Sequence, residues 1–368
     1  VIYLDGEEVT DLDTFFDNIK ANIGNAETTG SDPVKLALCV KRTDLKMAPV
    51  KEVVGWSETD PDDEFCNSAI NVNEPFVVTA TTADGEWYYG MSTNCKGWVP
   101  AECFAICDSR IEWAEMWNCS GENALYVTTG KITLEESNLA PQTSCLELML
   151  GTKLPLVPME EIVDADGNHL SIAERGTWYN YVVYVPTRDE NGKFVKSYGL
   201  VDIKENVSIG ELPFTKRNVL KVAFNCLGDR YGWGGMLGAL DCSLYTRSIY
   251  RCFGFELPRN TTWQCAIPTD NITLTGMSDK EKALTIKALE PGTLLEFEGH
   301  ITMYVGEDNG KLYVISALGN AAEADEYDDG LTVLKWYTVS VNTLDIRRGN
   351  GTTWLENMRY AIRPWKNR

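Results

Sequence analysis

The sequence predicts an α+β protein in which small β-barrels precede a domain of helices packed on an antiparallel sheet. Two observations support this prediction. Residues 34–212 consist of short β-rich runs separated by turn residues, and from residue 213 apolar stripes at helical spacing alternate with strand-like runs. The length of 368 residues allows two or three domains. We therefore expect an N-terminal helical segment at 1–33, barrels at 34–122 and 123–212, and the α+β domain at 213–368.

The first part of the chain divides into one helix and two sets of strands. Apolar residues at helical spacing between Thr10, a possible cap, and Gly24 predict the helix. The first barrel is expected to turn at Asp84-Gly85 and near Gly97. Strands of the second barrel are predicted at 146–156, 179–185 and 198–201.

The α+β domain is predicted to begin with a helix that ends at Gly228, followed by a glycine-rich turn at 231–235. Further helices are expected at 242–253, near 279–289 and around 354–362, and strands at 293–297, 300–305 and 311–318. Helices and strands in separate runs favour an α+β domain over a doubly wound one.

The composition excludes several classes of partner. The chain holds 33 Lys and Arg against 54 Asp and Glu, a net charge of −21, so we expect no nucleic-acid partner. No apolar run approaches the ~20 residues of a membrane-spanning helix, and we expect no membrane span. Eleven cysteines are scattered from Cys39 to Cys265 without the paired spacing of a zinc site, so we expect no metal and no other cofactor.

Cys242 is the candidate nucleophile. It follows the glycine-rich turn and starts a predicted helix, where unpaired backbone N–H groups and the helix dipole favour a thiolate. The same N–H groups can stabilise the oxyanion that forms when a carbonyl is attacked. A buried structural cysteine is the alternative for a thiol considered alone.

His300 is the candidate base, and the chain contains only two histidines. It starts a predicted strand in which His300, Thr302 and Tyr304 share one face. The end of a strand beside the start of a helix suits proton exchange with a cysteine. His169 lies in a polar turn of the second barrel, and we expect it to be solvated.

Four stretches of the last domain resemble, in this order, the catalytic domain of NlpC-type cell-wall cysteine peptidases, a papain-like family. They are 227–235 (LGDRYGWGG), 241–243 (DCS), 251–260 (RCFGFELPRN) and 299–306 (GHITMYVG). Upstream, 40–49 (VKRTDLKMAP) and 86–90 (EWYYG) through 97–100 (GWVP) resemble the bacterial SH3-type modules that precede this domain in one subgroup. The resemblance implies a papain-like catalytic domain behind a short helix and two SH3-like β-barrels.

By position, the resemblance implies that Cys242 is the nucleophile and that His300 is its general base and later the acid that protonates the leaving amine. Two positions depart from the family. Leu244 stands where many relatives have Gly, which we expect to change packing alone. Relatives usually carry a third polar residue, often His, on the next strand. Here Ser316 occupies that place and would orient the His300 ring, with Asn320 as the alternative.

The resemblance also implies a substrate site. Tyr231 would help to hold the oxyanion or the substrate, Asp241 would receive the free amine of an N-terminal L-Ala, and Ser243 would support polar groups of the substrate. An acid of the first barrel would complete the amine pocket, and the choice between Glu64 and Glu86 stays open.

The implied activity is hydrolysis of short bacterial cell-wall stem peptides, L-Ala-γ-D-Glu-diamino acid, at the bond between γ-linked D-Glu and the diamino acid. The first barrel would close one end of the cleft, which favours short peptides with a free N-terminus. Two alternatives are a noncatalytic cell-wall-binding protein with a decayed peptidase domain and an acyltransferase of the same fold. The start at Val1, without Met, and the cysteines favour export to the cell envelope or periplasm, with the cytoplasm as the alternative.

Overall fold

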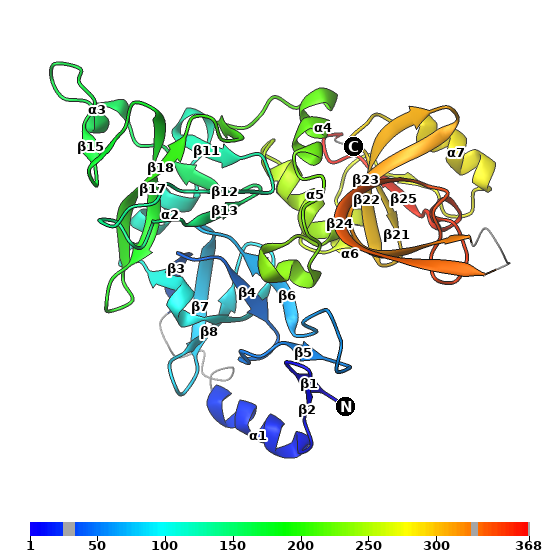
Figure 1. The fold of residues 1–368 in the computed structure, drawn as a ribbon, viewed down its shortest axis with the longest axis horizontal. Coiled ribbons are helices and arrows are strands. Elements are labelled where there is room, and N and C mark those ends of the chain that lie inside the picture. Colours follow the sequence, from blue (N-terminus) through cyan, green and yellow to red (C-terminus); the bar gives the residue numbers. More distant parts are fainter. Residues whose placement is uncertain (25–33, 325–329, 367–368) are drawn as a thin grey trace. The chain divides into compact units, whose positions relative to one another are not determined.

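The chain forms two compact units, Val1–Glu211 and Leu212–Arg368 (Figure 1). The computed structural model describes residues 1–24, 34–324 and 330–366, so residues 25–33 of the predicted N-terminal segment lie outside the described part. Within the described ranges, no helix combines the length and the apolar character that a membrane crossing requires.

The N-terminal helix α1 (Leu12–Ile23) is confirmed, with Gly24 after its last turn. Its cap is Asp11 rather than Thr10, because the Asp11 carboxylate accepts hydrogen bonds from the Thr14 N–H at 3.0 Å and from the Thr14 hydroxyl at 2.7 Å. Beside it lies a small sheet of β1 (Tyr3–Leu4), β2 (Glu7–Glu8) and β5 (Val54–Gly55) in the order β2-β1-β5.

The first β domain is one antiparallel sheet of seven strands in the order β10-β3-β7-β8-β9-β4-β6. The strands are β3 (Lys35–Cys39), β4 (Thr43–Lys46), β6 (Cys66–Ile70), β7 (Pro75–Thr81), β8 (Trp87–Met91), β9 (Lys96–Pro100) and β10 (Phe104–Ile106), the last preceded by the 3-10 turn η1 (Ala101–Cys103). The turn at Asp84-Gly85 is confirmed. The turn near Gly97 is also confirmed: it lies between β8 and β9, where the Ser92 N–H donates to the Cys95 carbonyl at 2.8 Å. Gly97 itself lies inside β9, and a side chain there would meet Leu45 at 2.4 Å and the Lys46 carbonyl at 2.6 Å.

The second β domain is built from three small antiparallel sheets, β14-β11-β19, β12-β13 and β17-β18, and from the two-residue pair β15-β16. Its elements are α2 (Arg110–Trp117), η2 (Gly121–Asn123), β11 (Ala124–Val127), β12 (Lys131–Thr133), β13 (Glu147–Met149), β14 (Lys153–Pro155), α3 (Met159–Ile162), β15 (Ser171–Ile172), β16 (Arg175–Gly176), β17 (Asn180–Arg188), β18 (Phe194–Asp202) and β19 (Val207–Ile209). The strand predicted at 146–156 is two strands, because Gly151 adopts a φ of +77° and turns the chain between them.

The second unit packs helices against a six-stranded antiparallel sheet in the order β20-β25-β21-β22-β23-β24. Its helices are α4 (Lys216–Phe224), η3 (Trp233–Gly238), α5 (Cys242–Arg251), α6 (Thr261–Cys265), α7 (Asp279–Lys287) and α8 (Trp354–Asn357). Its strands are β20 (Ile272–Thr273), β21 (Leu294–Phe297), β22 (His300–Asp308), β23 (Lys311–Ala324), β24 (Leu331–Thr343) and β25 (Tyr360–Ile362). Helix α5 packs against β22 and β23.

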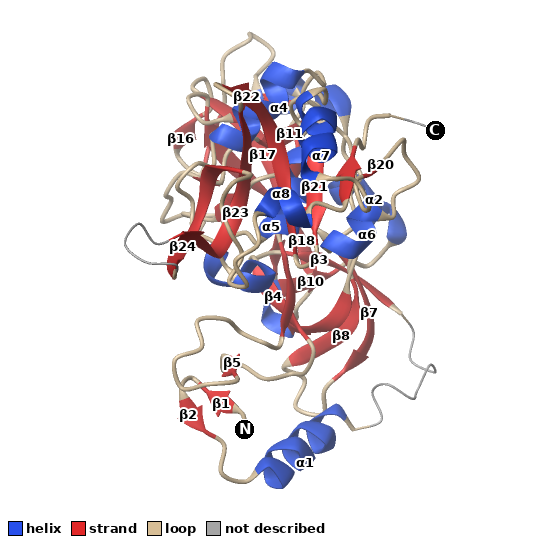
Figure 2. Cartoon of the chain, turned by 90° about the vertical axis from the view of Figure 1, so that its right-hand side faces the viewer, coloured by secondary structure: helices blue, strands red, loops and turns tan. Residues whose placement is uncertain are grey.

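Two predictions for this unit are wrong. The helix expected around 354–362 is the single turn α8 followed by β25, because Ala361 and Ile362 are buried where they pair with β21. Strand β24 was not expected, and β23 is longer than the predicted 311–318. Figure 2 shows β23 and β24 as two long neighbouring strands.

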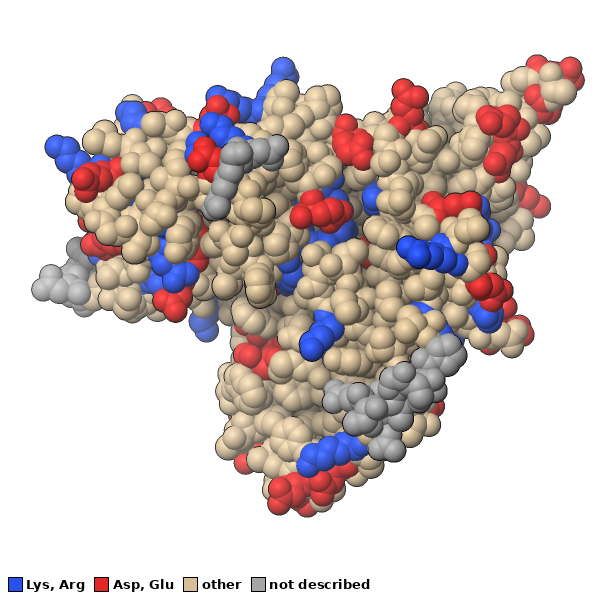
Figure 3. Space-filling view, turned by 180° about the vertical axis from the view of Figure 1, so that it is seen from behind, with Lys and Arg blue, Asp and Glu red and all other residues tan. Residues whose placement is uncertain are grey.

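Opposite charges are paired on the surface of both units. Acidic and basic side chains are interspersed on the face drawn in Figure 3. Exposed pairs include Lys51–Glu86 at 2.7 Å in the first unit and Lys287–Glu307 at 3.1 Å in the second. With 54 acids against 33 bases, a cation has many carboxylates to pair with.

Candidate active site

Cys242 is the first residue of α5, as the sequence predicts. Asp241 begins this helix as its N-cap, accepting a hydrogen bond from the Leu244 N–H at 2.8 Å. Leu244 is buried, with 3% of its surface exposed, which agrees with a packing role at this position. The half-buried Cys242 thiol therefore sits where the first backbone N–H groups of the helix have no carbonyl partner within it.

Arg259 binds the side chains of two residues at the start of this helix. Its guanidinium bonds both carboxylate oxygens of Asp241, at 3.1 and 2.5 Å, and donates to the Ser243 hydroxyl at 2.9 Å. The side chains of Arg259 and Asp241 are 6% and 10% exposed. The Ser243 hydroxyl also donates to Asp241 at 3.2 Å. The structure thus brings Asp241 and Ser243 together around Arg259, beside the thiol.

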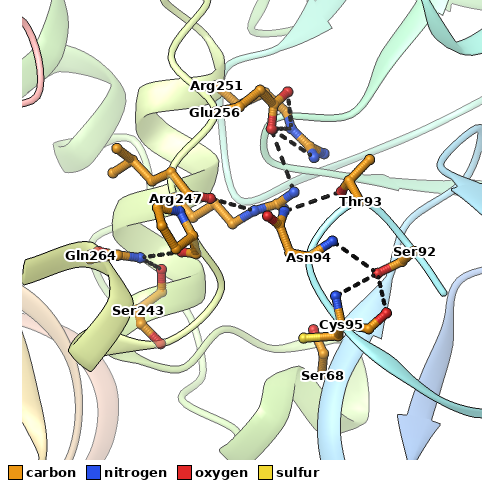
Figure 4. A network of polar contacts seen from close by, with 12 residues as sticks. Ser68, Ser92, Thr93, Asn94, Cys95, Ser243, Arg247, Arg251, Glu256 and Gln264 are labelled. Carbon is orange, nitrogen blue, oxygen red and sulfur yellow. Dashed lines mark hydrogen bonds and ion pairs between the residues drawn. The ribbon is translucent and has the colours of Figure 1, made fainter. Parts of the chain in front are cut away.

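Gln264 joins α6 to α5. Its amide nitrogen donates to the Ser243 carbonyl at 2.9 Å, as Figure 4 shows, and to the Pro258 carbonyl at 2.9 Å. Its amide oxygen accepts from the Thr246 hydroxyl at 2.9 Å. Because Gln264 is fully buried, these bonds fix α6 against α5 and place Thr261, the first residue of α6, next to the thiol.

The sheet brings His300 to the same place. The Cys242 sulfur accepts hydrogen bonds from the Thr261 side chain and from the backbone N–H of Ile301, the residue after His300. His300 starts β22 directly after a tight hairpin, in which it pairs with Phe297 and Gly299 adopts a φ of +87°. Cys242 and the first residues of β22 therefore meet, although they are 58 positions apart in the sequence.

Ser316 contacts the imidazole of His300. Its buried hydroxyl lies 3.0 Å from His300 Nε2. The imidazole packs against Phe297 and Trp354, with ring centres 5.4 and 5.0 Å away. Asn320, the other candidate for this role, is an exposed residue further along β23.

Burial sets the protonation states of the pair. It raises the pKa of the Cys242 thiol to about 11, an effect that Asp241 reinforces and the bonds from Ile301 and Thr261 oppose. The thiolate predicted from the helix start is thus disfavoured in the free enzyme. Burial also lowers the pKa of His300 to about 4, with Asp241 acting against this shift and Arg348 adding to it. At neutral pH, both shifts favour the neutral form, the thiol for Cys242 and the uncharged imidazole for His300.

A pH profile checks this assignment. The base is active when His300 is neutral, so the acid limb of kcat/KM should have its midpoint near pH 4 instead of near the ordinary value of 6.5. Because unfolded His300 binds a proton below pH 6.5 and folded His300 does not, stability should also fall as the pH drops through this range. Circular dichroism at each pH separates unfolding from titration. A midpoint at 6.5 with the fold intact would contradict the assignment.

Ser316→Ala tests the orienting hydrogen bond. We expect kcat to fall about 3- to 10-fold with little change in KM, because one neutral hydrogen bond is lost and substrate contacts are not. The matched control is Ser340→Ala: Ser340 pairs with Ser316 across the sheet, and its buried hydroxyl has no hydrogen-bond partner among the described residues. Equal losses in kcat for the two variants would show that Ser316 acts through packing alone.

Of the other residues considered from the sequence, one lies in the second unit and three lie in the first. Tyr231 is half-buried and bridges to Leu240, just before the Asp241 cap, and its ring contacts Tyr337 at 6.0 Å. His169, Glu64 and Glu86 belong to the first unit. His169 is exposed and bonds Thr177 at 3.1 Å, Glu64 is half-buried, and Glu86 pairs with Lys51. The acid of the predicted amine pocket stays open between Glu64 and Glu86.

Sequence reasoning did not assign Arg259, Thr261, Gln264 or Trp354 to the site. Arg259 lies in the stretch 251–260 that carries the family resemblance, and that stretch was the available signal. Nothing in the spacing of Trp354 points to His300, because the two are joined only by the folded sheet and α8. In the part of the chain that the structure describes, no group of three His, Cys, Asp or Glu side chains could hold a metal ion.

A thiol at the start of a helix and an imidazole bonded to a buried hydroxyl, on the antiparallel sheet against which that helix packs, are the groups that a cysteine peptidase requires. Comparison with known proteins gives the family. Residues 228–331 match the NlpC/P60 family, and residues 57–100 match the SH3 domain of SH3b1 type. The chain carries an NlpC/P60 cysteine peptidase domain preceded by an SH3b-type domain, which confirms the resemblance stated from the sequence.

Solved structures share the fold. An NlpC/P60 endopeptidase from Photobacterium damselae subsp. piscicida aligns with 96% of this chain and 79% of its own, with a TM-score of 0.75 and 16% sequence identity. An NlpC/P60 family protein from Bacillus cereus ATCC 10987 aligns with 89% of this chain and 99% of its own, with a TM-score of 0.57 and 16% identity. No curated protein matches the chain in sequence.

Proposed function

We propose that this cell-wall endopeptidase hydrolyses short stem peptides with a free N-terminal L-Ala, cutting the bond between γ-linked D-Glu and the diamino acid. The observation that carries the proposal is the constellation of Cys242, His300 and Ser316 at the junction of α5 and β22. The choice of bond rests on the DCS and PRN stretches and on the SH3b-type domain, which together resemble one subgroup of the family.

The geometry supports a two-step hydrolysis. Cys242 Sγ attacks the γ-carbonyl carbon of D-Glu while its proton passes to His300, and the N–H groups at the start of α5 stabilise the oxyanion. The C–N bond then breaks and His300 gives its proton to the leaving amine, which leaves a thioester. Water, deprotonated by His300, attacks the thioester, and the acid product and the thiol are released.

Asp241 has a second role in this proposal. Its carboxylate is bonded by Arg259, so a substrate amine bound there would share it with the guanidinium. We infer that Asp241 chiefly fixes the helix start and contributes negative charge to the amine site.

Mass spectrometry of peptide digests tests the proposed function. L-Ala-γ-D-Glu-L-Lys and its meso-diaminopimelate counterpart should each give L-Ala-D-Glu and the free diamino acid, and N-acetylation of L-Ala should slow the cleavage. A product heavier than hydrolysis allows, formed with an added amine, would indicate acyl transfer. Binding of the intact peptides without cleavage would support the noncatalytic alternative.

An exported location is also proposed, from the cell-wall substrate. Fractionation of the producing cells should recover the protein with the envelope or periplasm. Recovery with the cytoplasm would instead indicate peptide recycling inside the cell.

A further inference from the structure

Arg348 is a half-buried cation on the His300 side of the site. It lies in the turn between β24 and α8, where its N–H donates to the Thr352 carbonyl at 2.9 Å and its carbonyl accepts from the Gly351 N–H at 2.9 Å. Gly351 adopts a φ of +87°, which closes this turn. The backbone of Arg348 is therefore held in place.

The Arg348 side chain is one aromatic ring away from the catalytic base. Its guanidinium carbon lies 5.3 Å from the centre of the Phe297 ring, and that ring centre is 5.4 Å from the centre of the His300 ring. Stacking on an aromatic face restricts the planar guanidinium and leaves its N–H donors at the edge for another acceptor. The Arg348 charge is also close enough to act on His300, whose pKa it helps to lower.

No carboxylate neutralises this cation among the residues that the structure describes. Arg359, by contrast, bonds buried Glu296 at 2.5 and 3.2 Å. Within the described residues, Arg348 is thus a half-buried guanidinium that lies near His300 and has no carboxylate partner, in a chain with a net charge of −21. An anionic group of the substrate would be repelled by the rest of the protein and attracted here.

The position of Arg348 relative to His300 indicates which part of the substrate would carry this anionic group. His300 protonates the leaving amine, so the leaving residue lies on the imidazole side of the scissile bond. In the proposed substrate the leaving residue is the diamino acid, and its α-carbon carries both the leaving nitrogen and a carboxyl group. That carboxyl is a free anion only when the diamino acid ends the peptide.

We propose that Arg348 binds the free α-carboxylate of the leaving diamino acid, which makes peptides that end at this residue the preferred substrates. This inference rests on the proposed function and narrows it from stem peptides in general to tripeptides. A charge-assisted pair of this kind discriminates by about 10- to 100-fold in kcat/KM against a peptide that lacks the anion.

Two matched peptides test the inference: L-Ala-γ-D-Glu-L-Lys with a free C-terminal carboxylate and the same peptide as its C-terminal carboxamide. The wild-type protein should cleave the acid about 10- to 100-fold faster in kcat/KM. Arg348→Met keeps an unbranched chain on Phe297 and should bring this ratio close to one, whereas Arg348→Lys should keep part of it. Lys287→Met removes an exposed cation elsewhere in the same unit and should leave the ratio unchanged.

The outcomes separate this inference from the proposed function. Cleavage of both peptides at equal rates, or an Arg348→Met variant that keeps the wild-type ratio, would overturn the role of Arg348 and leave the proposed function standing. Cleavage of neither peptide would overturn the proposed function and this inference with it. Thermal unfolding of each variant establishes that the proteins compared are folded.

Discussion

Cys242→Ala is expected to abolish peptide hydrolysis, with kcat falling by about four orders of magnitude or more. The thioester cannot form without the sulfur, and the neighbouring groups do not replace it: Asp241 is bonded to Arg259, and the Ser243 hydroxyl lies between the same two side chains. The fold should remain intact, because Cys242 is a small side chain that is only half-buried at the helix start. Turnover of L-Ala-γ-D-Glu-L-Lys followed by mass spectrometry gives the rate.

Cys265→Ala is the matched control, since Cys265 is another half-buried free thiol of the same unit, at the end of α6. This variant should keep most of the wild-type rate. Peptide binding to Cys242→Ala, measured by calorimetry, separates loss of chemistry from loss of the site. Undiminished turnover by Cys242→Ala would show that another group is the nucleophile.

Much of the candidate site could be predicted because each part has a local signal. A glycine-rich turn followed by Asp241 predicts a helix start at Cys242, and the structure has one there. Alternation along two strands predicts that Ser316 faces His300, and their polar atoms are 3.0 Å apart. Such signals depend on a few residues close together in the chain, so they can be recognised in a single sequence.

The parts that could not be predicted depend on contacts distant in sequence. The stretch after residue 354 has helix-like spacing, yet residues 360–362 form strand β25. The reason is that pairing with β20 on one side and β21 on the other satisfies backbone groups that a short helix would leave unpaired. The thiol pKa was expected to fall at a helix start. Burial raises it instead, and burial is a property of the folded surroundings that spacing does not contain.

Loss of the Arg259–Asp241 pair is expected to give the largest change in stability. Arg259→Met should destabilise the second unit by about 3–5 kcal/mol, because it leaves a buried carboxylate without its cation. Asp241→Asn removes the charge but keeps a side chain that can cap α5. The stability that this variant loses therefore measures the ion pair and not the cap. Chemical denaturation followed by tryptophan fluorescence measures both.

The double variant decides how the pair acts. If the ion pair is the cause, Asp241→Asn combined with Arg259→Met should be less destabilised than the sum of the single variants, because neither charge is then left alone in a buried place. The exposed pair Lys287–Glu307 is the control, and breaking it should cost less than about 1 kcal/mol. In the single variants kcat should fall as well, since Arg259 and Asp241 hold the helix start that carries Cys242. If the stability losses of the two single variants simply add up in the double variant, Arg259 and Asp241 are not energetically coupled. If the single variants also keep full activity, the pair does not position the nucleophile.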